Sequence, residues 1–289
     1  MMKRGAVMKF TKMHGCGNDY IFVDCIRNPF TEEEKQNLEK IAVLGSDRRN
    51  GIGADGLILI QSSDIADFKM EMYNSDGSIG EMCGNGIRCV GKYVYDNELT
   101  RQTNPTIETR AGIKQLELNV TNGTVESVRV NMGKPELSPA QIPVCTKNQE
   151  TRVVDYPVEA GGVVYFITCV SMGNPHAVLF SNDILRVDVK YIGAMLEHHK
   201  MFPNRTNVEF VHVLDKNTIE MRVWERGSGE TFACGTGACA SVIACILHGY
   251  TEHKVTVHLL GGDLMIEYDE AADLVYMTGP AVTVYDAEL

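Results

Sequence analysis

The amino-acid sequence predicts an α+β protein that is built from two copies of one structural unit. A helix start with the pattern Cys-Gly-x-Gly occurs twice, at Cys83 and at Cys234. Each half of the chain also contains many short strand-like segments and one long helix-like segment, which favours an α+β fold over a parallel α/β sheet. The nucleotide-binding patterns GxGxxG after a strand and GxxxxGK[ST] do not occur, so the sequence does not support nucleotide binding.

The repeat extends upstream of the two cysteines in constant register. Residues 70–74 stand as far before Cys83 as residues 221–225 stand before Cys234. Further back, residues 56–59 fall opposite residues 207–210. One alternating strand, one polar loop and one helix start are therefore present twice, which indicates an internal duplication.

The repeated helix start has a chemical interpretation. A thiol in the first turn of a helix faces unpaired backbone N–H groups and the positive end of the helix dipole, which stabilise a thiolate and lower the pKa of the thiol. The two glycines let the backbone approach a bound anion, so each helix start can also hold a carboxylate. Two such helix starts around one carboxylate would place a thiol on either side of the adjacent carbon. This arrangement suits removal of a proton from one face of a stereocentre and its return to the other face.

In the first half, the helices are predicted from their start signals. Thr31 and Glu34 form a capping-box pattern, which predicts a helix as far as about Leu44. A second helix is predicted from Cys83 to about Asn97. The first strand is expected to start near residue 8, after an extension of seven residues. Alternating or buried apolar patterns predict strands at 9–13, 21–23, 57–61, 68–73, 106–109, 115–120 and 126–132.

The segment 133–162 shows no regular pattern and contains Pro135, Pro139, Pro143 and Pro157, so we expect the boundary between the two halves there. The second half then begins as the first does, with a strand that runs into a glycine-containing turn. Helices are predicted from 188 to about 199 and from Cys234 to 249. Strands are predicted at 165–170, 177–180, 207–213, 218–224, 255–259, 264–268, 274–277 and 281–285.

The composition restricts the class of protein. The net charge of −11 argues against a surface for nucleic acid or for an anionic membrane. A zinc ribbon or a thioredoxin-like site would require a CxxC pair, and the nine cysteines form none. An odd number of cysteines and the lack of a signal-peptide pattern predict reduced thiols in the cytoplasm. The apolar run 232–247 is shorter than the ~20 residues that a bilayer requires, so no membrane span is expected.

Seven motifs, taken together, resemble diaminopimelate epimerase, and the resemblance spans nearly the whole chain in order and spacing. The motifs are His14-Gly15-Cys16-Gly17-Asn18-Asp19-Tyr20, Asn74-Ser75-Asp76-Gly77, Met82-Cys83-Gly84-Asn85-Gly86, Gly173-Asn174-Pro175-His176, Arg205-Thr206-Asn207, Glu225-Arg226-Gly227 and Ala233-Cys234-Gly235-Thr236-Gly237.

The resemblance implies an isomerase that interconverts LL- and meso-diaminopimelate in the biosynthesis of lysine and of peptidoglycan precursors, without pyridoxal phosphate, another cofactor or a metal. It implies two similar domains, each a barrel-like sheet wrapped around a central helix, with the active site in the cleft between them. The expected domains are 1–133, to which the last strand, 278–289, returns, and 134–277.

The resemblance also assigns roles to residues of this chain. Cys83 and Cys234 are the expected acid/base thiols, and His176 and Glu225 are expected to tune their pKa values. The expected substrate-binding residues are Asn18, Asn74, Gly84, Asn85, Asn174, Asn207, Glu225, Arg226, Gly235 and Thr236. A planar guanidinium such as that of Arg226 can bind the distal carboxylate of diaminopimelate through two hydrogen bonds. Some relatives carry glutamine at the position of Gly56, so a side-chain contact is missing there.

Two alternatives remain open from the sequence. Another cofactor-independent racemase of the same fold, acting on histidine, proline or hydroxyproline, is the nearer one. The proline-type enzymes carry histidine where this chain has Asn85, and they have no use for a distal carboxylate clamp. The second alternative is a thiol-rich metal or redox module, which would require cysteine pairs at metal-binding spacing. A homodimer is compatible with base rates alone.

Overall fold

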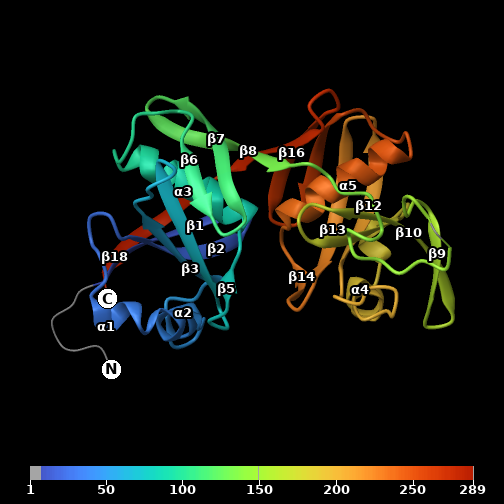
Figure 1. Cartoon of the computed structure of the whole chain (residues 1–289), viewed down its shortest axis with the longest axis horizontal. Coiled ribbons are helices and arrows are strands. Elements are labelled where there is room, and N and C mark those ends of the chain that lie inside the picture. The colour runs from blue at the N-terminus through green and yellow to red at the C-terminus, as the bar shows by residue number, and fades with distance from the viewer. Residues whose placement is uncertain (1–7, 149, 289) are drawn as a thin grey trace. The chain divides into compact units, whose positions relative to one another are not determined.

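The computed structural model describes residues 8–148 and 150–288, so the seven-residue extension expected at the N-terminus lies outside the described part. The chain forms two compact units, one of residues 1–130 with 279–289 and the other of residues 131–278. The chain passes from one unit to the other within the strands β8, Thr124–Gly133, and β17, Leu274–Pro280. Figure 1 shows that each unit consists of strands around a helix.

The first unit contains most of the elements of the N-terminal half and the last strand of the chain. Its helices are α1 (Glu32–Lys35), α2 (Leu38–Ser46) and α3 (Gly84–Asp96). Its strands are β1 (Lys9–Gly15), β2 (Asn18–Asp24), β3 (Gly56–Gln61), β4 (Phe68–Asn74), β5 (Ile79–Gly80), β6 (Thr106–Thr109), β7 (Gly112–Thr121), β8 and β18 (Val282–Glu288).

The second unit repeats this set of elements. Its helices are the 3₁₀ helix η1 (Ile184–Arg186), α4 (Val189–Glu197) and α5 (Gly235–Leu247). Its strands are β9 (Tyr156–Ala160), β10 (Val163–Ser171), β11 (Pro175–Phe180), β12 (Asn207–Asp215), β13 (Thr218–Glu225), β14 (Gly229–Thr231), β15 (Lys254–Leu259), β16 (Gly262–Asp269) and β17.

The strand pairing confirms the duplicated α+β fold. In the first unit β1–β2 is antiparallel, β2–β3 parallel, β3–β4 antiparallel, β4–β6 parallel and β6–β7 antiparallel. In the second unit the pairs β10–β11, β11–β12, β12–β13, β13–β15 and β15–β16 follow in the same order with the same directions. The additional strands also correspond, because β18 pairs antiparallel with β1 as β9 does with β10.

A buried helix lies in each unit, immediately after one of the repeated cysteines. α3 contacts β1, β2 and β7, and α5 contacts β10, β11, β12 and β16. Both helices have 13 residues, and most of them are buried around their whole circumference. The buried residues of α5 are nearly all apolar, which explains why 232–247 has the composition of a membrane span. Among the described residues, no helix is long and apolar enough to cross a membrane.

Two sequence expectations about elements were wrong. The helix expected from Thr31 to Leu44 is two helices, although its capping box is present at α1. The break follows from Asn37, whose side-chain amide donates to the Glu33 carbonyl at 2.7 Å while its backbone N–H bonds to Glu34, so the α-helical pattern is interrupted. In addition, β9 lies inside the segment 133–162 that was expected to be irregular. Its Pro157 is tolerated because, among the described residues, β9 pairs on one side only, with β10.

Candidate active site

Cys83 is the N-cap of α3, as its motif predicts. Its backbone is extended, with φ −128°, and its Sγ accepts the N–H of Gly86 at 3.4 Å. Glycine is needed at position 86 because a Cβ there would lie 2.6 Å from Cδ1 of Ile58 on β3. The half-buried thiol therefore lies against the open end of a helix, where backbone N–H groups favour a negative charge.

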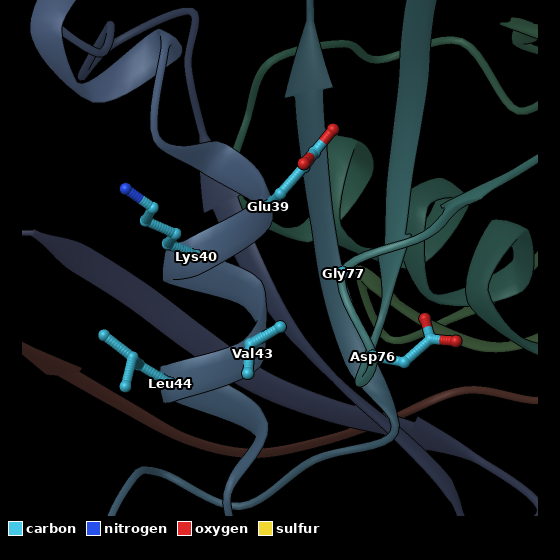
Figure 2. A pocket seen from close by; sticks show the side chains of 6 residues that line it. All are labelled: Glu39, Lys40, Val43, Leu44, Asp76 and Gly77. Carbon is cyan, nitrogen blue, oxygen red and sulfur yellow. The ribbon is translucent and has the colours of Figure 1, made fainter.

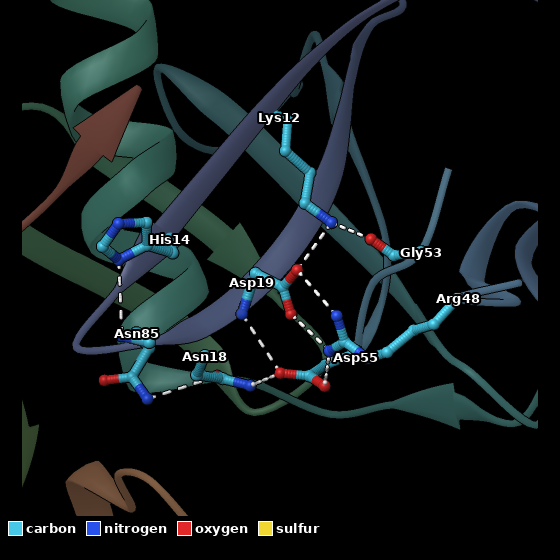
Figure 3. A network of polar contacts seen from close by, with 9 residues as sticks. Lys12, His14, Asn18, Asp19, Arg48, Gly53, Asp55 and Asn85 are labelled. Carbon is cyan, nitrogen blue, oxygen red and sulfur yellow. Dashed lines mark hydrogen bonds and ion pairs between the residues drawn. The ribbon is translucent and has the colours of Figure 1, made fainter. Parts of the chain in front are cut away.

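Asn18, at the start of β2, lies beside this thiol. Its Oδ1 is 3.3 Å from Cys83 Sγ and accepts from Nδ2 of Asn85 at 3.2 Å. Its own Nδ2 donates to Asp55 at 2.7 Å, which fixes the orientation of the amide (Figure 3). Because Oδ1 must then face the thiol, Asn18 presents an acceptor to Cys83, and the thiol can donate to it.

A charged network holds Asp55 in place (Figure 3). Arg48 donates to Asp55 at 2.8 Å and to Asp19 at 2.7 Å, and Lys12 is 2.6 Å from Asp19. Hydrogen bonds from Arg48 and Lys12 hold the pKa of Asp19 below its ordinary value against the opposing effect of burial. This network connects β1 and β2 to the loop before β3, and through Asp55 it orients Asn18.

Asn85 is buried and is oriented from the other side. The fully buried guanidinium of Arg88 donates from Nη2 to Oδ1 of Asn85 at 2.9 Å, and from Nη1 to the Gly84 carbonyl at 3.1 Å. Asn85 must therefore direct its Nδ2 toward Asn18. The first unit thus brings together Cys83, Gly84, Asn85 and Asn18 from the predicted set.

Asn74 ends β4, and its side chain bonds within its own turn, donating to Ser78 Oγ at 2.9 Å. Gly56 lies opposite Asn74 in the β3–β4 pair, where a Cβ would be 2.2 Å from the carbonyl oxygen of Tyr73. This close backbone approach explains the glycine in this chain. A larger residue at position 56 would require the backbone to move.

Cys234 repeats the geometry of Cys83 at the start of α5. Its φ is −120°, and its Sγ accepts the N–H of Gly237 at 3.3 Å. The hydroxyl of Thr236 lies 3.4 Å from the same sulfur. A Cβ at Gly237 would lie 2.8 Å from Oε1 of Glu209 on β12, at the position that Ile58 occupies in the first unit.

The pKa of Cys234 differs from the expectation. The helix start was expected to lower it, but burial raises the pKa of this thiol well above its ordinary value, with further contributions from the carboxylates of Glu225 and Glu209. The hydrogen bonds from Thr236 and Gly237 oppose this shift and are the smaller effect. The helix start alone therefore does not determine the pKa of Cys234.

Glu225, at the end of β13, is the carboxylate next to Cys234. Burial raises the pKa of Glu225, and the nearby Glu209 raises it further, while a hydrogen bond from Thr231 and one with the Cys234 thiol lower it. The carboxylate and the thiol thus form a hydrogen-bonded pair in which both groups hold a proton more tightly than in water.

His176 and Asn174 complete this group of side chains in the second unit. The fully buried imidazole of His176 is hydrogen-bonded through Nδ1 to Oε1 of Glu209 at 2.7 Å and through Nε2 to Oδ1 of Asn174 at 3.0 Å. Asn174 Nδ2 donates to the Thr236 hydroxyl at 3.2 Å. A chain of hydrogen bonds therefore runs from Glu209 through His176 and Asn174 to Thr236 and Cys234.

Asn207 and Arg226 form a separate polar contact. Asn207 is buried; it donates to the Pro175 carbonyl at 2.8 Å and accepts the backbone N–H of Arg226 at 3.0 Å. The exposed Arg226 side chain donates to the Asn204 carbonyl at 3.1 Å. Within the described chain no carboxylate forms an ion pair with Arg226, so its guanidinium has donors available for an anionic ligand.

Sequence reasoning missed Tyr20 and Glu209. The buried Tyr20 hydroxyl is hydrogen-bonded to Cys83 and Asn18, and burial followed by the Cys83 charge raises its pKa well above the ordinary value. The duplication contains the signal for both residues. Tyr20 pairs with Gly56 in β2–β3 as His176 pairs with Asn207 in β11–β12, and Ile58 stands in the register of Glu209.

Two surface hollows have none of the predicted site residues in their linings. One, of about 420 Å³, lies between α2 and the turn after β4 and is lined by Glu39, Lys40, Val43, Leu44, Asp76 and Gly77 (Figure 2). The other, of about 500 Å³, is lined by Leu185, Arg222, Glu230, Thr231, Phe232 and Leu260. Neither is lined by a cysteine. Among the described residues, no group of three His, Cys, Asp or Glu side chains could hold a metal ion.

Comparison with known proteins agrees with the motifs. The sequence model of the diaminopimelate epimerase family matches residues 10–138 and 168–284. The chain is 54% identical over 287 residues to a diaminopimelate epimerase of Agathobacter rectalis, covering 98% of this chain and 99% of that one. It is 51% identical over 285 residues to a diaminopimelate epimerase of Desulfovibrio desulfuricans, covering 97% and 98% of the two chains.

Solved structures share the fold at low sequence identity. A hydroxyproline epimerase from Agrobacterium vitis has a TM-score of 0.70 at 13% identity, over 98% of this chain and 91% of that one. A PhzF-family phenazine biosynthesis protein from Bacillus anthracis has a TM-score of 0.69 at 18% identity, over 98% and 99% of the two chains. These structures support the fold, whereas the full-length sequence identity identifies the family. This chain belongs to the diaminopimelate epimerase family.

Proposed function

We propose that this protein interconverts LL- and meso-2,6-diaminopimelate and that Cys83 and Cys234 are its two acid/base groups. It is accordingly an isomerase that supplies lysine and peptidoglycan precursor biosynthesis. One observation carries the assignment of the residues. In a chain that is 54% identical to a diaminopimelate epimerase, two thiols each cap a buried helix and each accept a backbone N–H from the second glycine of the motif.

The helix starts provide the electrostatic part of the mechanism. The α-hydrogen of an amino acid is only weakly acidic, so its removal requires donors that stabilise the developing negative charge. The backbone N–H groups at Gly84–Asn85 and at Gly235–Thr236 are such donors, and they are held in place by α3 and α5. The proposed steps require neither pyridoxal phosphate nor a metal, because these donors bind the carboxylate next to the reacting carbon.

The raised pKa of Cys234 suggests how the two thiols divide the work. A protonated Cys234 is the acid, which returns a proton to the α-carbon after Cys83 has removed one from the opposite face. In the reverse direction Cys234 must first lose its proton. Glu225, which is hydrogen-bonded to this thiol and has a raised pKa, is the group placed to accept it.

Specificity for diaminopimelate resides at the distal end of the substrate. Arg226 would hold the distal carboxylate, and Asn74, Asn207 and Glu225 would hold the distal ammonium group. Asn18 and Asn174, the two asparagines hydrogen-bonded around the thiol groups, would bind the reacting end. The two expected domains, 1–133 with 278–289 and 134–277, would each contribute one thiol. We further propose a cytoplasmic enzyme that acts as a homodimer on a small-molecule substrate and binds neither nucleic acid nor membranes.

A substrate panel tests this proposal. The purified chain would be incubated with LL-diaminopimelate, meso-diaminopimelate, L-histidine, L-proline and trans-4-hydroxy-L-proline, and the products would be separated on a chiral column. We expect turnover of the two diaminopimelate isomers alone, unaffected by a metal chelator. Preferred turnover of histidine or of a proline would replace the assigned substrate, and loss of activity with the chelator would contradict the metal-free mechanism.

A further inference from the structure

Glu209 is a buried carboxylate to which neither the motifs nor the proposed mechanism assigns a role. It lies on β12 with no exposed surface, and its Oε1 is 2.7 Å from Nδ1 of His176, which is equally buried. Its other oxygen, Oε2, has no hydrogen-bond partner among the described residues. A buried carboxylate with one unpaired oxygen opposes folding, so its presence calls for a compensating role.

The packing holds this carboxylate close to the first turn of α5. In the parallel β11–β12 pair, His176 lies opposite Asn207 and Val178 opposite Glu209, which places Asn207 and Glu209 on the same face of β12. The absence of a side chain at Gly237 leaves room for Oε1, since a Cβ there would be 2.8 Å away. The carboxylate is therefore confined between the His176 ring and the helix that starts at Cys234.

The first unit shows what stands at these positions when there is no imidazole. The residue that corresponds to His176 is Tyr20, and the residue in the register of Glu209 is Ile58. Ile58 packs against Gly86 as Glu209 packs against Gly237. A phenol has a single polar atom and needs no partner to choose between tautomers, whereas a neutral imidazole carries its proton on either of two nitrogens. Within this chain, the unit with a histidine at this position has the carboxylate of Glu209 beside it, and the unit with a tyrosine has the apolar Ile58.

From this geometry we infer that Glu209 is a positioning residue for His176: it accepts the Nδ1–H and so directs Nε2 to Asn174 and the Cys234 site. The inference rests on the proposed epimerase function and extends it. With the Nδ1 proton held by Glu209, Nε2–H donates to the amide oxygen of Asn174 at 3.0 Å, so Nε2 carries the proton that can be given up on this side. The same logic operates where a carboxylate fixes the tautomer of a catalytic histidine.

Ionisable groups from four elements face the Glu209 carboxylate. Those that face it are His176 from β11, Cys169 from β10, Glu225 from β13 and Cys234 at the start of α5. The Glu209 charge raises the pKa values of Cys169, Glu225 and Cys234, in each case after the larger effect of burial. Among these groups His176 is the one that can carry a positive charge, so it is the partner that stabilises the carboxylate.

The direct test is a ¹⁵N NMR titration of the histidine rings in the full chain, with the His176 signals assigned by their absence in His176→Gln. In the parent protein we expect a protonated Nδ1 throughout. In Glu209→Gln the ring should lose its second proton at a pH lower by about one unit or more, because the carboxylate that favours the imidazolium is gone. The matched control is Glu220→Gln, which removes the carboxylate from the partly exposed His212–Glu220 pair on β12 and β13, 3.0 Å apart. An unchanged His176 titration in Glu209→Gln would overturn the inference.

Kinetics then test whether Glu209 acts through His176. Glu209→Gln should lower kcat by about a hundredfold or more with KM changed less than about threefold, as expected when a histidine loses its tautomer-fixing carboxylate. Glu209→Asp, which keeps the charge, should restore part of kcat. In a His176→Gln background, Glu209→Gln should have no further effect on kcat. An equal loss in both backgrounds would show that Glu209 acts independently of His176.

The two experiments separate this inference from the proposed function. The NMR titration reports the His176–Glu209 pair whether or not the chain epimerises diaminopimelate. If the parent chain has no such activity and the titration behaves as expected, the proposed function fails and the pairing stands. If Glu209→Gln does not fold, as judged by circular dichroism, the comparison is made with Glu209→Asp, in which His176 should keep its parent titration. A shift there as large as one unit would contradict the pairing.

Discussion

At the scale of single residues, the two thiols have the same backbone geometry but different ionisable neighbours. Each sulfur accepts one backbone N–H, at 3.4 Å for Cys83 and 3.3 Å for Cys234. Cys83 faces Asn18 and the Tyr20 hydroxyl, whereas Cys234 faces two carboxylates. A neighbouring carboxylate disfavours a thiolate, and burial adds to that effect. The surroundings therefore raise the pKa of Cys234 against the effect of the helix start.

The first prediction concerns the titration of Cys234. The ultraviolet absorbance of thiolates would be measured against pH in the parent protein and in Cys234→Ala, and the difference between the two curves is the contribution of Cys234. Since burial and the two carboxylates raise the pKa, we expect the midpoint above the ordinary cysteine value of about 8.5. Glu225→Gln removes one of the anions and should move the midpoint to lower pH. A midpoint at or below the ordinary value in the parent protein would contradict the raised pKa.

The second prediction concerns Arg226. Arg226→Lys should lower kcat/KM for diaminopimelate by about tenfold or more, because a charge-assisted hydrogen bond contributes about 1.5–3 kcal/mol and lysine cannot replace the planar two-bond clamp. Thermal stability should stay close to that of the parent, because the side chain is exposed and, among the described residues, bonds only to the Asn204 carbonyl. The control is Arg129→Lys, the same substitution at an arginine that pairs with Glu117 and has no proposed role in substrate binding. Unchanged kcat/KM in Arg226→Lys would remove this residue from the substrate site.

At the scale of elements, the helix starts depend on what each glycine packs against. Gly86 lies over the end of the flexible Ile58 side chain, whereas Gly237 lies over the Glu209 carboxylate that is bonded to His176. We therefore expect an added methyl group to be tolerated better at Gly86 than at Gly237. An added methyl group can displace an isoleucine methyl more easily than a hydrogen-bonded carboxylate in a buried site.

The third prediction follows from this difference. Gly237→Ala should lower kcat/KM at least about tenfold more than Gly86→Ala does, a difference of about 1.4 kcal/mol in transition-state stabilisation. Gly45→Ala in α2 is the control, because a Cβ there meets only Cδ1 of Ile21, at 3.1 Å, and alanine favours the helix. Equal losses for Gly86→Ala and Gly237→Ala would show that the Glu209 contact has no influence on activity.

The sequence predicts these elements well where one local rule dominates. The starts of α3 and α5 and the hairpins of the C-terminal tail follow from Cys-Gly-x-Gly and from alternation. The break before α2 was missed because the side-chain amide of Asn37 competes with the backbone, an effect that apolar periodicity does not record. Glu209 was missed because the alternating strand 207–213 gave no indication that a carboxylate at this position is fully buried against a histidine.

At the scale of the whole molecule, the duplication was visible in the register of the two cysteines, and the strand order of the two units confirms it. What the duplication could not predict is the divergence between the copies. At corresponding positions the first unit has Tyr20, Ile58 and Asn74 and the second has His176, Glu209 and Glu225, so the second unit has three ionisable groups where the first has one phenol. A two-base reaction requires one acid and one base at any moment, and two chemically different surroundings can hold two thiols in different protonation states.

The central claim is that Cys83 and Cys234 act on opposite faces of one α-carbon. The measurement that tests it most directly compares epimerisation with α-hydrogen exchange in D₂O for Cys83→Ala and Cys234→Ala, using each diaminopimelate isomer in turn. We expect each variant to lose at least about a thousandfold in epimerisation, or about 4 kcal/mol. Each variant should still exchange the α-hydrogen of one isomer, and the isomer that Cys83→Ala exchanges should be the opposite of the one that Cys234→Ala exchanges. Epimerisation near the parent rate in either variant, or exchange of the same isomer by both, would contradict the two-base account.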